Sequence, residues 1–129
     1  VHRIGIQGHY NIYGPSEEEM EAAVARFSEI VDHIHMTELD VRVNMQRGGQ
    51  LNFDRGDASN ITPEKIRLQE EMYRRVFRVM RTHADKVDCV TFWNLGDADS
   101  WLGADNYPLL FDKDYNPKDA YYKVRDFAE

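Results

Sequence analysis

Cysteine is nearly absent from this sequence, in which Cys89 is the one cysteine among 129 residues. A single thiol excludes an internal disulfide and any metal site built from several cysteines. Because Cys89 lies in an apolar run and free cysteines are usually buried, we expect it to be an inert core residue. No apolar run approaches the roughly 18 residues of a membrane span, and the N-terminus lacks the apolar centre of a signal peptide.

Positive charge is scarce as well. The 16 lysines and arginines are outnumbered by 23 aspartates and glutamates, which gives a formal net charge of -7. The basic residues form no patch, so neither nucleic acid nor an anionic membrane is expected as a partner. A neutral ligand fits this charge balance better.

The length of the chain limits its architecture. A complete (β/α)8 barrel needs about 250 residues, and this chain has 129. Strand-like runs over residues 3–9, 34–40 and 87–93 alternate with helix-like segments, which favours an α/β fold with parallel strands. Three strands alone would leave two open sheet edges, which proteins normally cover. We therefore expect three βα units, a portion of a barrel of eight.

Helix starts are signalled at three places by side chains that cap a helix or by a proline in its first turn. These are Ser16 with Glu19, Thr62 with Pro63, and Asn116 with Pro117. Residues 41–60 lie before the second of them and are polar, with several glycines. Loops of this length are usually functional or disordered.

The run over residues 34–40 carries the strongest candidate chemistry. It is apolar and ends in two carboxylates, Glu38 and Asp40. Side chains two apart share one face of a strand, so both carboxylates should point the same way, on the face that also holds Ile34 and Met36. Because residues at the carboxyl ends of barrel strands are typically catalytic, Glu38 is the first candidate for chemistry.

Two other groups of residues could suggest a metal site. His33 and His35 should lie on the strand face opposite to the carboxylates, which counts against a site that combines both histidines with a carboxylate. Asp97, Asp99 and Asp105 could bind a cation, but a solvated acidic loop is the simpler interpretation. No metal or other cofactor is expected.

The other strand ends are polar and aromatic. The first strand ends with Gln7 and His9, and the third is followed by Trp93 and, in the next loop, Trp101. Indole rings offer apolar faces to the C–H groups of a sugar, and polar side chains fix its orientation through hydrogen bonds. Together these strand ends predict a pocket for a neutral, polyhydroxylated ligand.

Several motifs in the same order and spacing resemble the C-terminal part of glycoside hydrolase family 10 xylanases. The resemblance runs from residue 3 to about residue 125, nearly the whole chain. The motifs are GIQGHYN (residues 5–11), TELD (37–40), VTFW (90–93) continuing through Asp97 to Ser100-Trp101, YPLLFD (107–112) and YNPK (115–118). TELD alone would be a weak signal.

The resemblance implies a (β/α)8 barrel that cleaves β-1,4-xylan with retention of configuration. Glu38 matches the nucleophile, and His9 and Asp40 match residues that hydrogen-bond around it. The residues matched to substrate binding are Gln7, Tyr10, Trp93 and Trp101. The partners implied are xylan or xylo-oligosaccharides, and the location is outside the cell or at its surface, because xylan is an extracellular polymer.

The sequence also departs from the family pattern. The family's general acid/base is a Glu after Asn at the end of the fourth strand, and no such motif occurs here. Asn94 stands where the family usually has Gly. The match begins at the sixth strand, so residues 1–129 are expected to be the C-terminal fragment of a single glycosidase barrel domain, with an N-terminal fragment as partner. A carbohydrate-binding remnant without catalysis, or a metal-dependent barrel hydrolase, are the alternatives.

Overall fold

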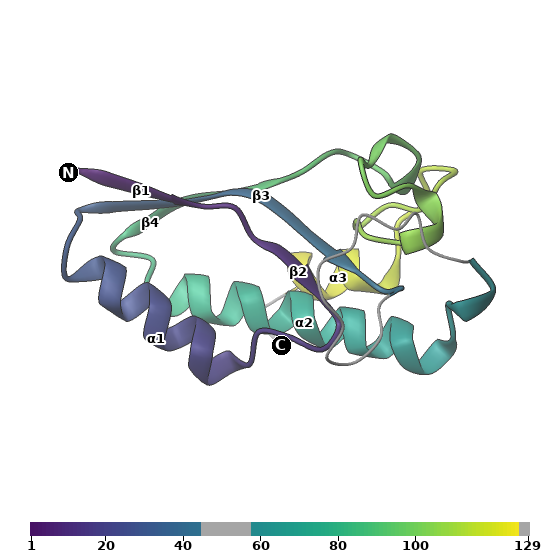
Figure 1. The fold of residues 1–129 in the computed structure, drawn as a ribbon, viewed down its shortest axis with the longest axis horizontal. Helices are drawn as coiled ribbons and strands as arrows, with labels where there is room; N and C mark the ends of the chain where they lie inside the picture. Colours follow the sequence, from purple (N-terminus) through teal and green to yellow (C-terminus); the bar gives the residue numbers. More distant parts are fainter. Residues whose placement is uncertain (45–57, 127–129) are drawn as a thin grey trace.

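The computed structural model describes residues 1–44 and 58–126 of the chain. Strands and helices alternate along it (Figure 1). In chain order the elements are the strands β1 (Arg3–Ile6) and β2 (His9–Asn11), the helix α1 (Glu17–Ser28), the strand β3 (His33–Arg42), the 3-10 helix η1 (Ala58–Asn60), the helix α2 (Pro63–Thr82), the strand β4 (Val87–Phe92), the 3-10 helices η2 (Asp97–Asp99) and η3 (Ala104–Asn106), and the helix α3 (Asp119–Arg125). No helix in these ranges is both long and apolar enough to cross a membrane.

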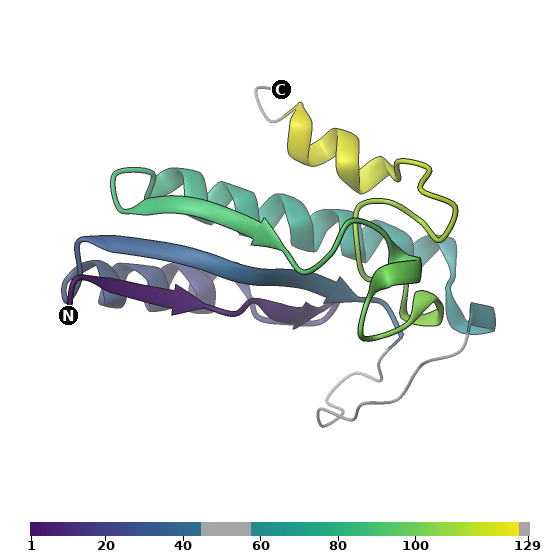
Figure 2. The same ribbon diagram turned by 90° about the horizontal axis from the view of Figure 1, so that it is seen from above.

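The strands form one parallel sheet with β3 in its centre. β1 and β2 follow each other along one edge of β3, and β4 lies along the other edge (Figure 2). The helices α1 and α2 cover one face of this sheet (Figure 1). The predicted α/β architecture with parallel strands is therefore confirmed. Within the described residues, the outer edges of β1 and β4 have no strand partner.

Two of the three predicted helix starts are correct. Ser16 Oγ accepts a hydrogen bond from the backbone N–H of Glu19 (3.1 Å), and Thr62 Oγ1 accepts one from that of Lys65 (3.3 Å). The third helix, α3, begins at Asp119, later than the Asn116-Pro117 signal predicts. The cause is the hydrogen bond from the Lys118 N–H to the carbonyl of Leu110 (2.9 Å), which keeps the backbone extended up to that residue.

The first strand is interrupted, although the sequence predicts a continuous strand over residues 3–9. Gly8 adopts a φ of 79°, which separates β1 from β2. A Cβ at this position would lie 3.0 Å from Met36 Sδ and 3.5 Å from Leu39 Cα. Glycine suits this position for two reasons: it permits the left-handed conformation, and it avoids a tight contact between a Cβ and the Met36 side chain.

The core lies between the sheet and the helices. Its buried side chains include Ile34, Met36, Leu39 and Val41 of β3, Met20 and Val24 of α1, and Met72, Tyr73, Val76, Val79 and Met80 of α2. Burying an aliphatic side chain of this size contributes about 1.5–3 kcal/mol. The helix-covered face of the sheet is thus the one that stabilises the fold.

Cys89 is exposed, and the prediction of a core cysteine is wrong. The reason is a β-bulge in β4: Ile34 pairs with Val87 and His35 pairs with Cys89, so Asp88 is an extra residue on β4. The extra residue shifts the alternation of faces. Cys89 consequently lies on the face away from the helices, where its Sγ is 3.6 Å from Thr91 Oγ1.

Candidate active site

The carboxyl ends of β2, β3 and β4 meet at one end of the sheet. His9 of β2 is paired directly with Asp40 of β3. On the other side of β3, the backbone N–H of Trp93 donates to the carbonyl of Leu39 (2.9 Å). The strand register therefore brings the predicted site residues of three different strands together.

A second bulge sets the direction of Glu38. Met36 pairs with Val90 and Leu39 with Phe92, so β3 has one residue more than β4 over this stretch. The helix-facing positions consequently change from Ile34 and Met36 to Leu39 and Val41. Glu38 and Asp40 share a face, as the sequence predicts, but it is the face opposite to Ile34 and Met36, so that part of the prediction is wrong.

The same bulge overturns the predicted direction of the two strand histidines. His33 and His35 lie on the face of Glu38, where His33 Nδ1 is 3.0 Å from Asp88 Oδ2 and His35 Nε2 is 2.8 Å from Thr91 Oγ1. The two histidines and the two carboxylates thus share a face, so their predicted separation gives no argument against a metal site that combines them. In residues 1–44 and 58–126 no group of three or more His, Cys, Asp or Glu side chains is arranged to hold a metal ion.

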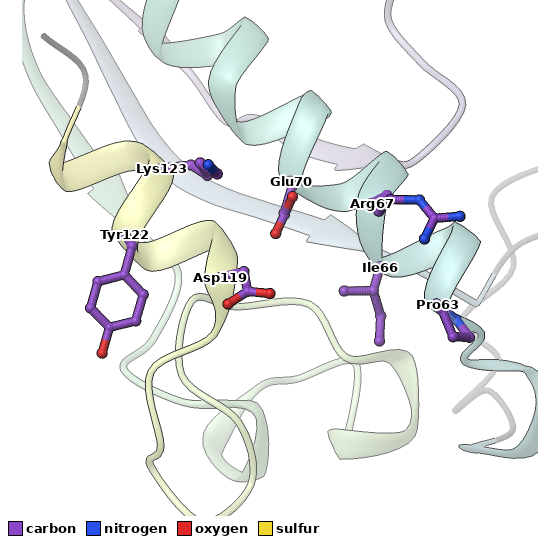
Figure 3. Close-up of a pocket in the computed structure, with 7 residues that line it drawn as sticks. All are labelled: Pro63, Ile66, Arg67, Glu70, Asp119, Tyr122 and Lys123. Carbon is purple, nitrogen blue, oxygen red and sulfur yellow. The ribbon is translucent and has the colours of Figure 1, made fainter. Parts of the chain in front are cut away.

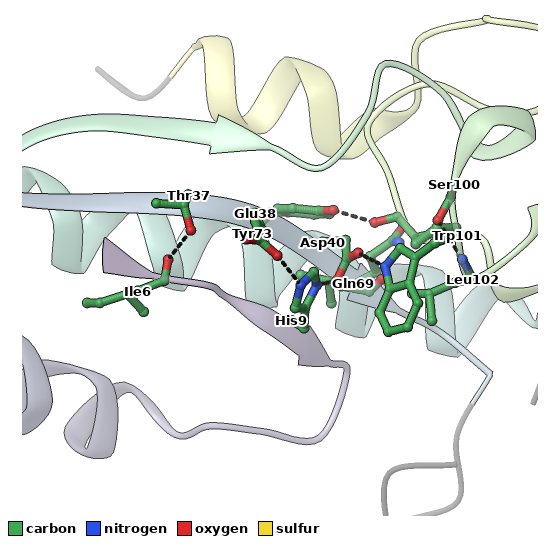
Figure 4. Close-up of polar contacts among 12 residues, drawn as sticks. Ile6, His9, Thr37, Glu38, Asp40, Gln69, Tyr73, Ser100, Trp101 and Leu102 are labelled. Atoms are coloured by element: carbon green, nitrogen blue, oxygen red, sulfur yellow. Dashed lines mark hydrogen bonds and ion pairs between the residues drawn. The ribbon is translucent and has the colours of Figure 1, made fainter. Parts of the chain in front are cut away.

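His9 connects the two carboxylates (Figure 4). Its Nε2 is 2.9 Å from Glu38 Oε2, and its Nδ1 is 3.0 Å from Asp40 Oδ1. An ionised carboxylate only accepts hydrogen bonds, so with both carboxyl groups ionised the two contacts are those of an imidazolium, whose two ring N–H groups donate. The ring is thereby held at both ends, and Glu38 is oriented by it.

The electrostatics of the cluster agree with this arrangement. Burial disfavours the charged form of His9, but hydrogen bonds and charge interactions with Asp40 and Glu38 outweigh it and raise the pKa of His9 above its ordinary 6.5. Burial raises the pKa of Asp40, an effect opposed by hydrogen bonds from Trp101 and His9 and by the charge of Arg42. Asp40 is 0% exposed, whereas Glu38 remains partly accessible.

Two indoles stand beside this cluster. Trp101 Nε1 donates to Asp40 Oδ2 (2.9 Å), and its ring lies edge-on to the His9 ring with centroids 5.2 Å apart. The Trp93 ring is 6.4 Å from the His9 ring, again edge-on. Trp93 and Trp101 are 43% and 45% exposed, so each presents apolar surface beside His9, the residue that contacts Glu38.

Gln7 and Tyr10 are placed differently from the other predicted residues. Gln7 is exposed, and it is its backbone carbonyl that accepts a hydrogen bond from the N–H of Glu38 (2.9 Å). Tyr10 pairs with Val41 and packs against the core, so its side chain does not join His9 and Glu38. Burial raises the pKa of the Tyr10 hydroxyl. The assignment of both residues to substrate binding stays a prediction.

Polar groups of α2 hold the loop that follows β4, a role that the sequence does not reveal. Gln69 Nε2 donates to the carbonyls of Val41 (3.0 Å) and Tyr107, and the Tyr73 hydroxyl donates to the carbonyl of Pro108. Both side chains are almost fully buried. Tyr73 gives no signal of this role, because it lies in the apolar stripe of α2, whereas a Gln in that stripe is a weak hint of it.

Asp97 is buried, and the prediction that it belongs to a solvated acidic loop is wrong. It is 1% exposed, its Oδ1 accepts from the N–H of Leu109 (2.8 Å), and its Oδ2 lies 2.8 Å from Lys118 Nζ. Burial raises the pKa of Asp97 and lowers that of Lys118 to about 8, while the partners' opposite charges limit both shifts. This ion pair joins the loop after β4 to Lys118, the residue before the first residue of α3.

A groove of about 660 Å³ lies elsewhere, between α2 and α3 (Figure 3). Its lining is mixed in character and consists of Pro63, Ile66, Arg67, Glu70, Asp119, Tyr122 and Lys123. None of the residues that contact His9 or Glu38 lines it. The groove is therefore separate from the strand-end cluster.

Three comparisons relate this chain to known proteins. The family model described as Glycosyl hydrolase family 10 matches residues 1–127. The chain is 53% identical over 124 residues to an endo-1,4-beta-xylanase/feruloyl esterase of Xylanibacter ruminicola, and 35% identical over 130 residues to endo-1,4-beta-xylanase B of Paenibacillus barcinonensis. A solved psychrophilic glycoside hydrolase family 10 endo-beta-1,4-xylanase is 46% identical and superposes with a TM-score of 0.84.

The coverage of these comparisons is unequal. The alignments with the Xylanibacter and Paenibacillus proteins each include 96% of this chain, but 17% and 38% of those proteins' own lengths. The alignment with the solved xylanase covers 98% of this chain and 36% of that xylanase. The chain thus spans much less than the length of the proteins it matches, as a portion of a (β/α)8 barrel does. By sequence and by fold, this chain belongs to glycosyl hydrolase family 10.

Proposed function

We propose that the chain is the C-terminal fragment of a single glycosidase barrel domain and supplies the nucleophile half of an endo-1,4-β-xylanase. The observation that carries this proposal is the contact of Glu38 with His9, which is itself held by the buried Asp40. A carboxylate oriented in this way, at a strand end and beside two exposed indoles, is suited to attack a sugar ring. The xylanase relatives support β-1,4-xylan as the substrate.

In this proposal Glu38 attacks the anomeric carbon and forms a covalent glycosyl-enzyme, which water then hydrolyses with net retention. Retaining glycosidases need a second carboxyl group about 5–5.5 Å from the nucleophile to protonate the leaving oxygen. Asp40 is unsuited to that task, because it is buried and both of its oxygens already accept hydrogen bonds. The missing N-terminal part of the barrel would supply the acid/base.

Trp93 and Trp101 would form walls of the substrate cleft. Their exposed faces flank His9 and Glu38, and stacking of sugar C–H groups on indoles requires such apolar surface. Gln7 would add a polar contact to the substrate, and His9 and Asp40 would position the nucleophile. Tyr10 is proposed for substrate binding on the family resemblance alone, because its side chain packs against the core. Because xylan is an extracellular polymer, we place the working protein outside the cell or at its surface.

Reducing-end release from β-1,4-xylan by the full-length protein that carries this chain tests the proposal. Glu38→Gln is expected to lower kcat by about three orders of magnitude or more while the fold and oligosaccharide binding remain. Glu18→Gln, at an exposed position of α1, is the matched control. A Glu38→Gln variant within about tenfold of wild type would contradict the nucleophile assignment.

A non-catalytic carbohydrate-binding role is the second candidate. The two exposed indoles beside His9 favour it, because Trp93 and Trp101 could hold a sugar whether or not an acid/base completes the site. Binding of xylo-oligosaccharides by the full-length protein without release of reducing ends would support this role instead of hydrolysis.

A further inference from the structure

Asn94 has an unusual backbone conformation for a residue with a side chain. It follows Trp93 just after β4 and adopts a φ of 122°, which residues other than glycine rarely do. Its side chain is exposed, so burial of apolar surface does not compensate for this conformation. Such strained residues persist only where the surrounding contacts fix them, and they are frequent at functional sites.

The contacts that fix Asn94 are made by its own carboxamide. Nδ2 donates to the carbonyl of Asp99 (3.0 Å), and Oδ1 accepts from the N–H of Leu95 (3.3 Å). The first bond connects the end of β4 to the last residue of η2. The second holds the chain in the turn that the unusual φ creates.

Asp99 is held from the other side as well. The Tyr115 hydroxyl donates to Asp99 Oδ2 (2.9 Å), and the Tyr115 ring would lie 2.9 Å from a Cβ placed on Gly96. Tyr115 is itself in the left-handed region, with a φ of 61°. Asn94 and Tyr115, both in disfavoured backbone conformations, thus hydrogen-bond to the same residue of η2.

The helix η2 lies just before Trp101 in the chain. Trp101 is two residues beyond Asp99, and its Nε1 donates to Asp40 Oδ2 (2.9 Å). The same Asp40 holds His9, which contacts Glu38. A displacement of η2 would therefore move the indole that faces the cleft and would remove a hydrogen bond from the buried carboxylate.

We propose that Asn94 is a positioning residue: its carboxamide holds η2 so that Trp101 reaches Asp40 and presents its exposed face beside Glu38. The inference rests on the proposed xylanase function for its effect on substrate. Asn94 acts through Trp101 and does not need to contact the sugar.

The test uses Asn94→Gly and Asn94→Ala in the full-length protein. Glycine removes the carboxamide and relieves the backbone, so its Tm should stay close to wild type, whereas alanine keeps the strained φ and should lower the Tm. Both should raise KM for xylo-oligosaccharides about three- to tenfold, with a smaller change in kcat. Tyr115→Phe should have the same effect more weakly, and Asn60→Gly, in the exposed η1, is the control.

A second readout does not depend on activity. In protein labelled with ¹⁵N-tryptophan, the Trp101 indole N–H is assigned by its loss in Trp101→Phe, and its exchange with water should accelerate about tenfold in both Asn94 variants. Unchanged indole exchange and KM in Asn94→Gly would overturn the proposal. If the wild-type protein does not hydrolyse xylan, the proposed function fails, and the exchange rate alone still decides whether Asn94 positions Trp101.

Discussion

Asp40 lies directly opposite His9 in the pairing of β2 with β3, and their side chains meet with Nδ1 of His9 3.0 Å from Oδ1 of Asp40. The contact joins two strands of the sheet and does not depend on a loop. A site built on paired strands is held more rigidly than one built on loops. The orientation of Glu38 through His9 is thus a consequence of the sheet register.

The charge of His9 should contribute to stability in a pH-dependent way. Its pKa is raised in the folded protein, so the stabilisation is complete below the ordinary value of 6.5 and is lost as the pH rises through the higher folded pKa. We expect the difference in Tm between wild type and His9→Gln to be constant at low pH and to shrink above about pH 6.5. Thermal unfolding between about pH 5 and 9 measures it.

A direct titration checks the same claim. The ring signals of His9, assigned by their absence in His9→Gln, should report a pKa above 6.5. A His9 pKa below 6.5 would mean that burial outweighs the effect of the two carboxylates. It would contradict the assignment of His9 as an imidazolium.

Trp101 should contribute to substrate binding in two separable ways. Trp101→Ala removes both the aromatic face and the hydrogen bond to Asp40, and should raise KM for xylo-oligosaccharides about tenfold. Trp101→Phe keeps an aromatic face and loses only the N–H donor, so a smaller increase is expected. Steady-state kinetics with a defined oligosaccharide distinguish them. An unchanged KM in Trp101→Ala would remove this residue from the cleft.

Gly8→Ala should destabilise the protein by about 1–3 kcal/mol. The φ of 79° disfavours alanine, and the new Cβ would lie 3.0 Å from Met36 Sδ. Gly14→Ala is the control, because no atom lies within 4 Å of its added Cβ. Urea unfolding of the full-length protein gives both values. Equal stability of the two variants would show that the close approach of β3 to Gly8 is unimportant.

The sequence predicts much of the fold because its signals are local. Ser16 and Thr62 cap their helices where expected, and the alternation of strands and helices gives the parallel sheet. The meeting of His9, Glu38 and Asp40 is also predictable, since carboxyl ends of parallel strands gather at one edge. These features need only periodicity and capping.

The remaining features depend on pairing between distant residues. The bulges at Asp88 and near Glu38 come from the register of β3 with β4, which no local pattern encodes. They explain why the face of His35 and the burial of Cys89 are predicted wrongly. The burial of Asp97 likewise depends on Lys118, which is far away in the sequence but 2.8 Å away in space.

The most direct test of the account is to trap the covalent intermediate on Glu38. A 2-deoxy-2-fluoro xylobioside with a good leaving group forms a slowly hydrolysed glycosyl-enzyme in a retaining glycosidase. Mass spectrometry of the full-length protein, followed by peptide mapping, should find one sugar on the peptide that contains Glu38, and none in Glu38→Gln. Label on a different carboxylate, or turnover of xylan with inversion at the anomeric carbon, would contradict Glu38 as the nucleophile.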